Sequence, residues 1–450
     1  MRLLHPRALV FILLISSGPL CASSSPDEVF TVARAVQTAF ERNPDILNGR
    51  DRIIEGQSTE SFTRSQAFPN ISAKLTAYEK KAAVNSGSPA FGGDPYNQYI
   101  GQIDLSQPIY AAGAISSAIG AAKKETQIRE FDLEITKRDL TLSVLQAFYS
   151  ILLNEKLLDI YRDAEQVQKE SLATSRRYHE SGRGQLIDVY QNETQLALIT
   201  RKIVQTENQV KASGYLLATL LHATDLSNIR AKGELTILNR TQIDKILEQK
   251  KAERYELSRQ LLKYDQFEFN RTLQLASNLP TLSLIGNINR TATDKNELTS
   301  SNSTAWTVGL QLNIPLFSGL SSINQRHILN AQESQLKDQE IKLRDQLSLQ
   351  EIQAMTSLNN AETVLTASQK AADFSKKALN EAKKNYRVQM IGPFQFLLIE
   401  QSYLDAQSSN LNAKFNYLVA LENCFVALGA PLSVLVDMLE NNHAAETLEK

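Results

Sequence analysis

Glycine and proline are scarce in this sequence. The chain has 18 glycines and 12 prolines among 450 residues, which is below the usual frequencies of about 7% and about 5%. Both residues form tight turns and end helices, so their scarcity favours long uninterrupted elements over a loop-rich fold. The composition therefore predicts a mainly α-helical protein.

Net charge and long apolar runs are also missing. The 48 basic and 49 acidic residues leave a formal net charge of −1, which gives no reason to expect a nucleic-acid partner. Beyond the amino terminus, no apolar run approaches the roughly 18 residues that a membrane-spanning helix needs. The mean hydropathy is −0.27. A helical transporter with several spans is thus excluded.

The amino terminus has the order of a secretory signal peptide. Arg2 and Arg7 precede an apolar run at residues 8–15, and small residues follow as far as Ala22. This succession of charged, apolar and small residues predicts a signal peptide at residues 1–25 and export of the mature chain.

Cysteine is nearly absent. Signal cleavage would remove Cys21 and leave Cys424 as the single thiol, so no disulfide within the chain is expected. A lipoprotein signal has a small residue directly before its cysteine, but Leu20 stands there, which argues against lipidation of Cys21. We expect Cys424 to be a small buried residue on a helix.

Four landmarks recur in the same order about 208 residues apart, which indicates a duplicated unit. The matched pairs are Pro69 with Pro280, Pro108 with Pro315, Tyr178 with Tyr386, and His222 with Gly429. The expected organisation is a first repeat at residues 26–225, a linker at 226–241, a second repeat at 242–432 and a polar tail at 433–450.

Each repeat is predicted to contain a helix followed by two strands. The helix ends before Pro69 or Pro280, because proline cannot continue a helix and favours extended geometry in the preceding residue. Beyond each proline, apolar and polar residues alternate with period two, as at Ile71, Ala73 and Leu75. The predicted strands are at about 70–84 and 98–107 and at about 281–290 and 304–314, with polar loops at 85–97 and 291–303.

Strands of roughly 10 residues with one apolar and one polar face are typical of a transmembrane β-barrel with a wet lumen. An amphipathic hairpin packed on a soluble core would show the same alternation and is the alternative. Four strands cannot close around a lumen. The membrane interpretation therefore requires several chains to share one barrel and to pair each other's edges.

A long helical hairpin is predicted after each strand pair, at residues 114–222 and 318–428. The first arm of each hairpin contains no proline, and an unbroken helix of that length would extend about 100 Å. The turns at the two tips are expected at Gly182 and Gly184 and at Gly392 and Pro393.

Seams with spacings of three and four residues are expected to hold these hairpins together, as in a coiled coil. In the first repeat the seam comprises Leu140, Val144, Ala147, Ile151, Asn154, Leu158 and Tyr161. In the second repeat it comprises the smaller and more polar Leu343, Leu347, Gln350, Ala354, Ser357 and Ala361.

This ordered set of features resembles the outer membrane efflux protein (TolC) family. The resemblance rests on the signal peptide, the tandem repeat, the corners Gln107-Pro108-Ile109-Tyr110 and Ile314-Pro315-Leu316-Phe317-Ser318-Gly319, and the turn from Gly182 to Asp188. It implies a homotrimer in the bacterial outer membrane. Four strands per chain would form a 12-stranded barrel, which would continue as a long α-helical barrel through the periplasm.

The resemblance also implies a function and partners. The channel would passively conduct substrates from an inner-membrane ABC or proton-driven pump and a periplasmic adaptor protein, in drug efflux or type I protein secretion. It would contact outer membrane lipid and no nucleic acid. The alternative is a periplasmic coiled-coil adaptor or structural scaffold, which would use the same hairpins without outward-facing apolar strands.

Two residues near the tip turns match positions that close the entrance in this family. Asp188 matches the acidic residue after the first turn, and Tyr386 matches the tyrosine before the second turn. Each also has a purely structural interpretation. Asp188 could stabilise the start of a helix through its unpaired N–H groups, and Tyr386 could simply pack between helices.

The other entrance positions depart from the TolC type. Gln395 and Leu398 stand where that type has two pore aspartates, and Ile391 stands in place of its arginine. The aspartate ring and the arginine are therefore missing. We expect hydrophobic residues, namely Phe394, Phe396 and Leu398, to close the entrance instead.

No motif for catalysis or metal binding is found. The five histidines have no partner four residues away and no nearby cysteine, and the sequence contains no P-loop, H-E-x-x-H or G-x-S-x-G motif. We expect a conduit that is not an enzyme and has no cofactor. Pro69, Pro108, Pro280 and Pro315 are expected to be structural corners between strands and helices.

Overall fold

The computed structural model describes residues 28–81, 95–223, 229–238, 240–250, 254–294, 304–388 and 390–448. The expected signal peptide at 1–25, with Cys21, lies outside these residues, as does the greater part of the loops expected at 85–97 and 291–303.

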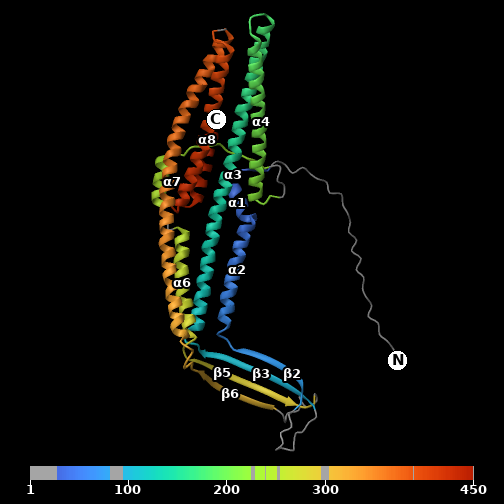
Figure 1. Cartoon of the computed structure of the whole chain (residues 1–450), viewed down its shortest axis with the longest axis vertical. Coiled ribbons are helices and arrows are strands. Elements are labelled where there is room, and N and C mark those ends of the chain that lie inside the picture. The colour runs from blue at the N-terminus through green and yellow to red at the C-terminus, as the bar shows by residue number, and fades with distance from the viewer. Residues whose placement is uncertain are drawn as a thin grey trace, which may run out of the picture.

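The molecule is elongated, with a sheet at one end and the tips of two helical hairpins at the other (Figure 1). Two series of elements follow each other in the same order. The first series is α2 (Pro44–Ser65), β2 (Asn70–Lys80), β3 (Tyr96–Tyr110), α3 (Ala114–Glu180) and α4 (Leu186–Leu220). The second is α6 (Tyr255–Ala276), β5 (Thr281–Ala292), β6 (Thr304–Asn313), α7 (Ser321–Arg387) and α8 (Pro393–Ala427). Corresponding helices have equal lengths of 22, 67 and 35 residues.

The strands form one antiparallel sheet in the order β2-β3-β5-β6, so β3 and β5 join the two series. Leu105 of β3 lies opposite both Ile71 of β2 and Gly286 of β5, and Gly286 lies opposite Val308 of β6. Side chains alternate between the two faces of a sheet, so every second residue along each strand lies on the same face as Ile71, Leu105, Gly286 and Val308. The period-two pattern of the sequence therefore becomes one apolar face that spans all four strands.

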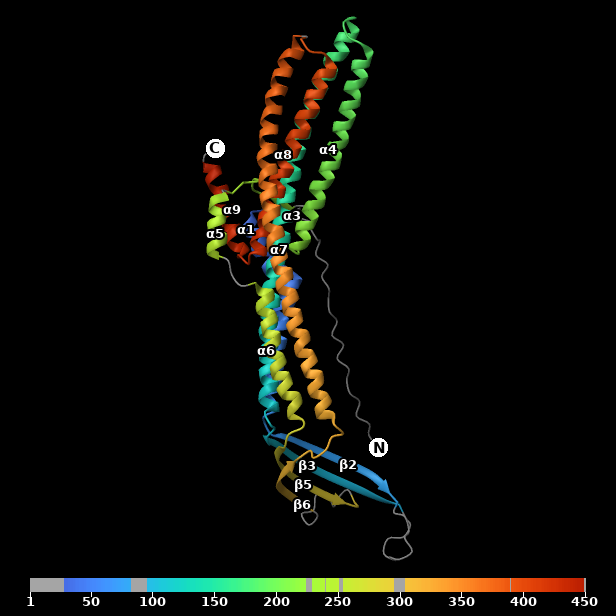
Figure 2. The ribbon, with the colours of Figure 1, turned by 60° about the vertical axis from the view of Figure 1, so that its left-hand side comes forward.

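None of the described helices covers this apolar face. Leu75 is 85% exposed and Trp306 is 73% exposed, and Figure 2 shows the sheet projecting beyond the ends of the long helices. The opposite face is polar, and there Asn287 Nδ2 donates a hydrogen bond of 2.6 Å to Asp104 Oδ1. The strands are thus not packed on a soluble core of this chain.

Three of the four prolines lie at strand ends, and one does not. Pro69 and Pro280 directly precede β2 and β5, and Pro315 follows β6. Pro108 instead lies inside β3, beside an irregularity in its pairing with β5. The corner into α3 is at Gly113, whose φ of 83° is favourable only for glycine. A bulge explains the position of Pro108, because the missing N–H is tolerated where the ladder is interrupted.

The long helices α3 and α7 change partners along their length. Near the sheet, α3 packs against α2 and α6, and farther away it packs against α4 and α8 (Figure 1). The expected seam of α3 is buried from Leu140 to Leu158. At 67 residues, α3 extends about 100 Å.

The expected seam of α7 is wrong in its register. None of its six residues is fully buried, whereas residues seven apart do face the interior, namely Leu358, Leu365, Ala372, Leu379 and Tyr386. This row of residues is buried where α7 packs on α8, because three of its five side chains are leucines, which favour burial. Small and polar residues at the expected positions gave too weak a pattern to distinguish one register from the next.

A smaller group of elements lies beside the middle of the long helices (Figure 2). It contains β1 (Glu28–Phe30) paired in parallel with β4 (Ile229–Ala231), and the helices α1 (Val32–Arg42), α5 (Arg240–Lys250) and α9 (Leu432–Leu448). The expected linker at 226–241 therefore contains a strand, and the expected polar tail at 433–450 is mostly helix α9. Leu432, Leu435, Val436 and Leu439 of α9 are buried, since their spacing places them on one helix face.

Among the helical residues that the structure describes, no stretch is both long and apolar enough to cross a bilayer.

Candidate functional site

The tip turns join the arms of the two hairpins. Between α3 and α4, the amides of Arg183 and Gly184 donate to the carbonyl of Tyr178 at 2.8 and 3.0 Å, and Gly182 has a φ of 70°. This arrangement ends α3 with a left-handed residue, as glycine allows. At the other tip, Gly392 precedes α8 and Pro393 is its first residue, where a missing N–H costs nothing.

Asp188 lies in the first turn of α4. Its carboxylate accepts a hydrogen bond from the backbone N–H of Gln185 at 3.4 Å. This contact is the one expected for a residue that stabilises a helix start. In a single chain, Asp188 therefore has a local structural partner, and its part in an entrance stays a prediction.

Tyr386 connects the two hairpins. It is buried on α7 and stacks on Phe396 of α8, with ring centroids 4.7 Å apart and planes 13° apart. Its hydroxyl lies 3.4 Å from Ser175 Oγ of α3. The side chain thus both packs within the second hairpin and forms a polar contact with the first.

Sequence reasoning missed the polar network behind this contact. Asn192 of α4 donates to Ser175 Oγ at 2.9 Å, while its Oδ1 accepts from Ser171 Oγ at 2.9 Å and from Gln168 Nε2 at 2.8 Å. All four side chains are buried. A signal existed, because the three- and four-residue spacing of the α3 seam continues past Tyr161 to Gln168, Ser171 and Ser175.

Further hydrogen bonds hold the hairpins together below the tip. Gln195 Nε2 of α4 donates to Gln401 Oε1 of α8 at 3.0 Å, and the Tyr161 hydroxyl lies 3.3 Å from Ser408 Oγ. Residues of α3, α4 and α8 also form a small apolar cluster around Leu404. The contact between the hairpins therefore combines apolar packing with a few specific polar bonds.

An exposed apolar groove of about 370 Å³ lies between α4 and α8 near the tip. It is lined by Ile187 and Tyr190 from α4 and by Phe394 and Leu398 from α8, among others. Gln395 is exposed outside the groove. The structure therefore brings Leu398 and Phe394 together.

The expected role of Phe396 in closing the entrance is wrong for this structure. Phe396 is buried against Tyr386, Leu379 and Ala382 on the side of α8 that packs on α7. Positions 394 and 398 are four residues apart and share a helix face, but position 396 is turned well away from them. Phe396 stabilises the hairpin instead.

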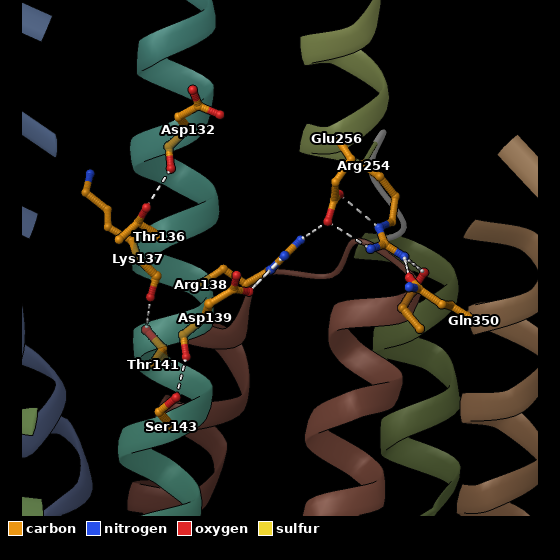
Figure 3. A network of polar contacts seen from close by, with 11 residues as sticks. Asp132, Thr136, Lys137, Arg138, Asp139, Thr141, Ser143, Arg254, Glu256 and Gln350 are labelled. Atoms are coloured by element: carbon orange, nitrogen blue, oxygen red, sulfur yellow. Dashed lines mark hydrogen bonds and ion pairs between the residues drawn. The ribbon is translucent and has the colours of Figure 1, made fainter. Parts of the chain in front are cut away.

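A second polar site joins the two halves of the chain at mid-length (Figure 3). Arg138 of α3 donates to Glu256 Oε1 at 2.7 Å, and Arg254 donates to the same carboxylate at 3.0 and 3.2 Å and to Gln350 of α7 at 3.2 Å. Burial alone would raise the pKa of Glu256, but the hydrogen bonds from Arg254 and Arg138 lower it to about 2. This ion network fixes α3, α6 and α7 relative to each other.

Neither site has the composition of a metal centre. Among the residues that the structure describes, no group of three or more histidine, cysteine, aspartate or glutamate side chains is arranged to hold a metal ion. Cys424 is buried, and burial raises the pKa of its thiol to about 11.

Comparisons with known proteins agree with this architecture. The family model described as outer membrane efflux protein matches residues 35–221. The proteases secretion protein PrtF of Dickeya chrysanthemi is 22% identical over 346 residues, which are 73% of this chain and 72% of PrtF. The fusaric acid resistance protein FusA of Burkholderia cepacia is 24% identical over 180 residues, which are 39% of this chain and only 34% of FusA.

Solved structures share the fold over nearly the whole chain. The CmeC outer membrane channel of Campylobacter jejuni superposes with a TM-score of 0.79 and 16% identity, covering 88% of this chain and 85% of CmeC. The MtrE outer membrane channel of Neisseria gonorrhoeae, in its open state, gives a TM-score of 0.75 and 16% identity, covering 89% of each chain.

Two long helical hairpins joined to an exposed four-stranded sheet define a component of an outer membrane channel with a long periplasmic part. Over residues 35–221 the chain matches the outer membrane efflux protein family, and its fold is TolC-like. Proteins of this class are transport channels and not enzymes.

Proposed function

We propose that three copies of this chain form an exit duct through the outer membrane. The duct passively conducts substrates that an inner-membrane pump and a periplasmic adaptor deliver to the helical tip. The observation that carries the proposal is the sheet, which has an exposed apolar face and leaves the outer edges of β2 and β6 unpaired among the described strands. Open edges cannot face lipid, so neighbouring copies must pair them.

Ring closure through these edges also brings particular helices together. Helix α2 leads directly into β2, and α7 follows β6. If β6 of one copy pairs with β2 of the next, α7 of the first copy must therefore run beside α2 of the second. Both helices have exposed apolar side chains, namely Leu47, Ile54 and Phe62 on α2, and Ile323 and Ile341, which share one face of α7 because they lie 18 residues apart.

These two apolar stripes have matching heights. Phe62 lies three residues from the sheet end of α2, and Ile323 lies two residues from the sheet end of α7. At about 1.5 Å per residue, Leu47 lies about 27 Å from the sheet end of α2, and Ile341 lies about 30 Å from the sheet end of α7. The stripes can therefore meet along the whole of α2, which supports a ring of identical chains.

The cargo of the duct follows from its partners. One relative is named for resistance to a small molecule and another for secretion of proteases, so the same channel plan serves both kinds of transport. The polar sheet face would line the lumen, as in other barrels. We propose that the pump and adaptor choose the substrate and that this chain supplies the passage.

Two measurements test the proposal. The purified mature protein should require detergent, sediment as a trimer, and produce discrete conductance steps in planar lipid bilayers when adaptor protein is present. A chain that stays soluble and monomeric without detergent would support the alternative of a periplasmic adaptor or scaffold. Trimers that insert but never conduct would exclude the duct.

A further inference from the structure

Glu400 is a buried carboxyl group without a partner. It lies on α8, one turn from Phe396 and one turn from Leu404, and is only 1% exposed. Neither carboxyl oxygen has a hydrogen-bond partner in the described part of the chain. Buried polar atoms are nearly always hydrogen-bonded, so an unpaired carboxyl group at this depth calls for an explanation.

The contact between the two hairpins covers Glu400. Residues 396, 400 and 404 are spaced by four and share one face of α8. Leu404 packs in a cluster with Leu158 and Ala164 of α3, and the cluster of Phe396 includes Val167 of α3. Glu400 lies between Phe396, which packs mainly on α7, and Leu404, which packs on α3, so it is covered where α8 meets both helices and parting the hairpins would remove the α3 side of this cover.

Among the residues that the structure describes, no charged group lies within hydrogen-bond distance of the Glu400 carboxyl oxygens. On α7, Lys383 is the charge whose field reaches Glu400, and Arg387 lies farther toward the tip. On α3, Asp163 lies near Tyr403, Glu165 and Lys169 pair with each other at 3.0 Å, and Glu170 and Arg177 line an open groove with Lys383. On α4, Glu193 is engaged by Arg176 of α3 at 2.6 Å. Burial raises the pKa of the nearby Tyr403 phenol, so it carries no charge at ordinary pH.

Burial raises the pKa of Glu400 to about 7, although the field of Lys383 acts in the opposite direction. A carboxyl group that is exposed to water has an ordinary pKa of 4.5. The packed arrangement therefore favours the protonated, neutral form, which has no charge to desolvate.

We propose that Glu400 makes the contact between the hairpins sensitive to protons, so that its protonated form holds α8 against α3 and its ionised form favours their separation. This inference rests on the proposed function, in which the helical tip is the entrance of the duct. The packed state binds the proton more tightly than the separated state. Raising the pH from 4.5 through 7 therefore increases the equilibrium constant for separation of the hairpins, by on the order of 100-fold per chain. Above that range, no further change in this constant is expected.

Spin labels at Ser181→Cys and Met390→Cys, one on each exposed tip, report the separation in trimers reconstituted in lipid nanodiscs. Labelled chains are diluted with unlabelled ones so that most trimers contain a single labelled copy. Between about pH 5 and about pH 8, the wild-type background should lose its short distances. Glu400→Gln, which is neutral at every pH, should keep them throughout.

The matched control is Glu381→Gln, which removes a carboxylate that is exposed and paired with Lys384 on α7. It should titrate like the wild type. The inference is overturned if wild-type distances do not change with pH, or if Glu400→Gln follows the wild-type curve.

Two further readouts separate the possible failures. The infrared absorbance of protonated carboxyl groups at about pH 6 should be smaller in Glu400→Gln than in the wild type, while buried Glu422, whose pKa is also raised by burial, contributes to both; equal absorbance in the two proteins would contradict the assignment. Bilayer conductance of the same trimers tests the duct independently. Trimers that conduct without any pH response would disprove the role of Glu400 and leave the proposed function intact.

Discussion

The hydroxyl of Tyr386 on α7 lies 3.4 Å from Ser175 Oγ on α3, and this contact joins the two helical hairpins near their tip. We predict that Tyr386→Phe weakens the contact while keeping the ring stacked on Phe396. A net loss of about 0.5–1.5 kcal/mol is expected from one hydrogen bond. Spontaneous conductance without adaptor should therefore rise roughly 2- to 10-fold.

The partner residue provides the control for this prediction. Ser175→Ala removes the same contact, so the double variant should show less than the sum of the two single effects. Ser175 also accepts from Asn192, so its single variant should have the larger effect. Fully additive effects would show that Tyr386 and Ser175 do not act as a pair.

Leu398 is 62% exposed in the apolar groove between α4 and α8. We predict that Leu398→Asp creates a ring of three carboxylates in the assembled trimer, because the variant charge would face the entrance of each copy. Carboxylate rings bind cations in narrow pores, so divalent cations should block the conductance more strongly than in the wild type.

Gln395→Asp is the matched control, since Gln395 is exposed on the same helix but outside the groove. It should change the block less than Leu398→Asp does. Unchanged block in Leu398→Asp would place Leu398 away from the entrance, and equally strengthened block in both variants would show that the groove does not distinguish the two positions.

The ion network at mid-length should contribute to stability. Glu256 is held by Arg138 and Arg254, and its side chain is 15% exposed. We predict that Glu256→Gln lowers the free energy of unfolding by about 1–3 kcal/mol, because two half-buried guanidinium groups lose their shared carboxylate. The exposed variant Glu381→Gln should change it by less than about 0.5 kcal/mol.

The same carboxylate gives a pH dependence with a definite sign. Its pKa falls from the ordinary 4.5 to about 2 in the folded chain, so the folded state binds the proton less tightly than the unfolded state. The stabilisation is therefore complete above pH 4.5 and is lost as the pH falls toward 2. Thermal unfolding of wild type and Glu256→Gln should differ most above this window and converge below it. Curves that stay parallel down to about pH 2 would contradict the assignment.

Large-scale features of the fold were predictable from the sequence because they depend on repeated patterns. Alternating residues such as Ile71, Ala73 and Leu75 set the strand faces, and the large apolar residues of the α3 seam set its buried row from Leu140 onward. Each pattern is repeated many times, so a single exception does not change the outcome, as with Ile285, an apolar residue on the otherwise polar face of β5.

Details that depend on a partner element were not predictable. The buried row of α7 is decided by where α8 packs, and no single-helix pattern contains that information. Gln168, Ser175 and Asn192 are buried polar residues that hydrogen-bond to each other across two helices, and this pairing favours their burial. Pro108 was expected at a corner, but the bulge that accommodates it within β3 depends on pairing with β5.

The trimer itself should depend on the apolar stripes of α2 and α7. Phe62 is 69% exposed and Ile341 is 60% exposed in the single chain, and both should become buried between neighbouring copies. We predict that Phe62→Lys and Ile341→Lys each reduce the trimer fraction at low protein concentration in detergent at least about tenfold, because a buried unpaired ammonium group is strongly unfavourable. Gln57→Lys adds the same charge on a flank of α2 and should leave assembly unchanged. Sedimentation across a dilution series measures all three, and a Phe62→Lys variant that assembles like Gln57→Lys would show that α2 and α7 do not meet.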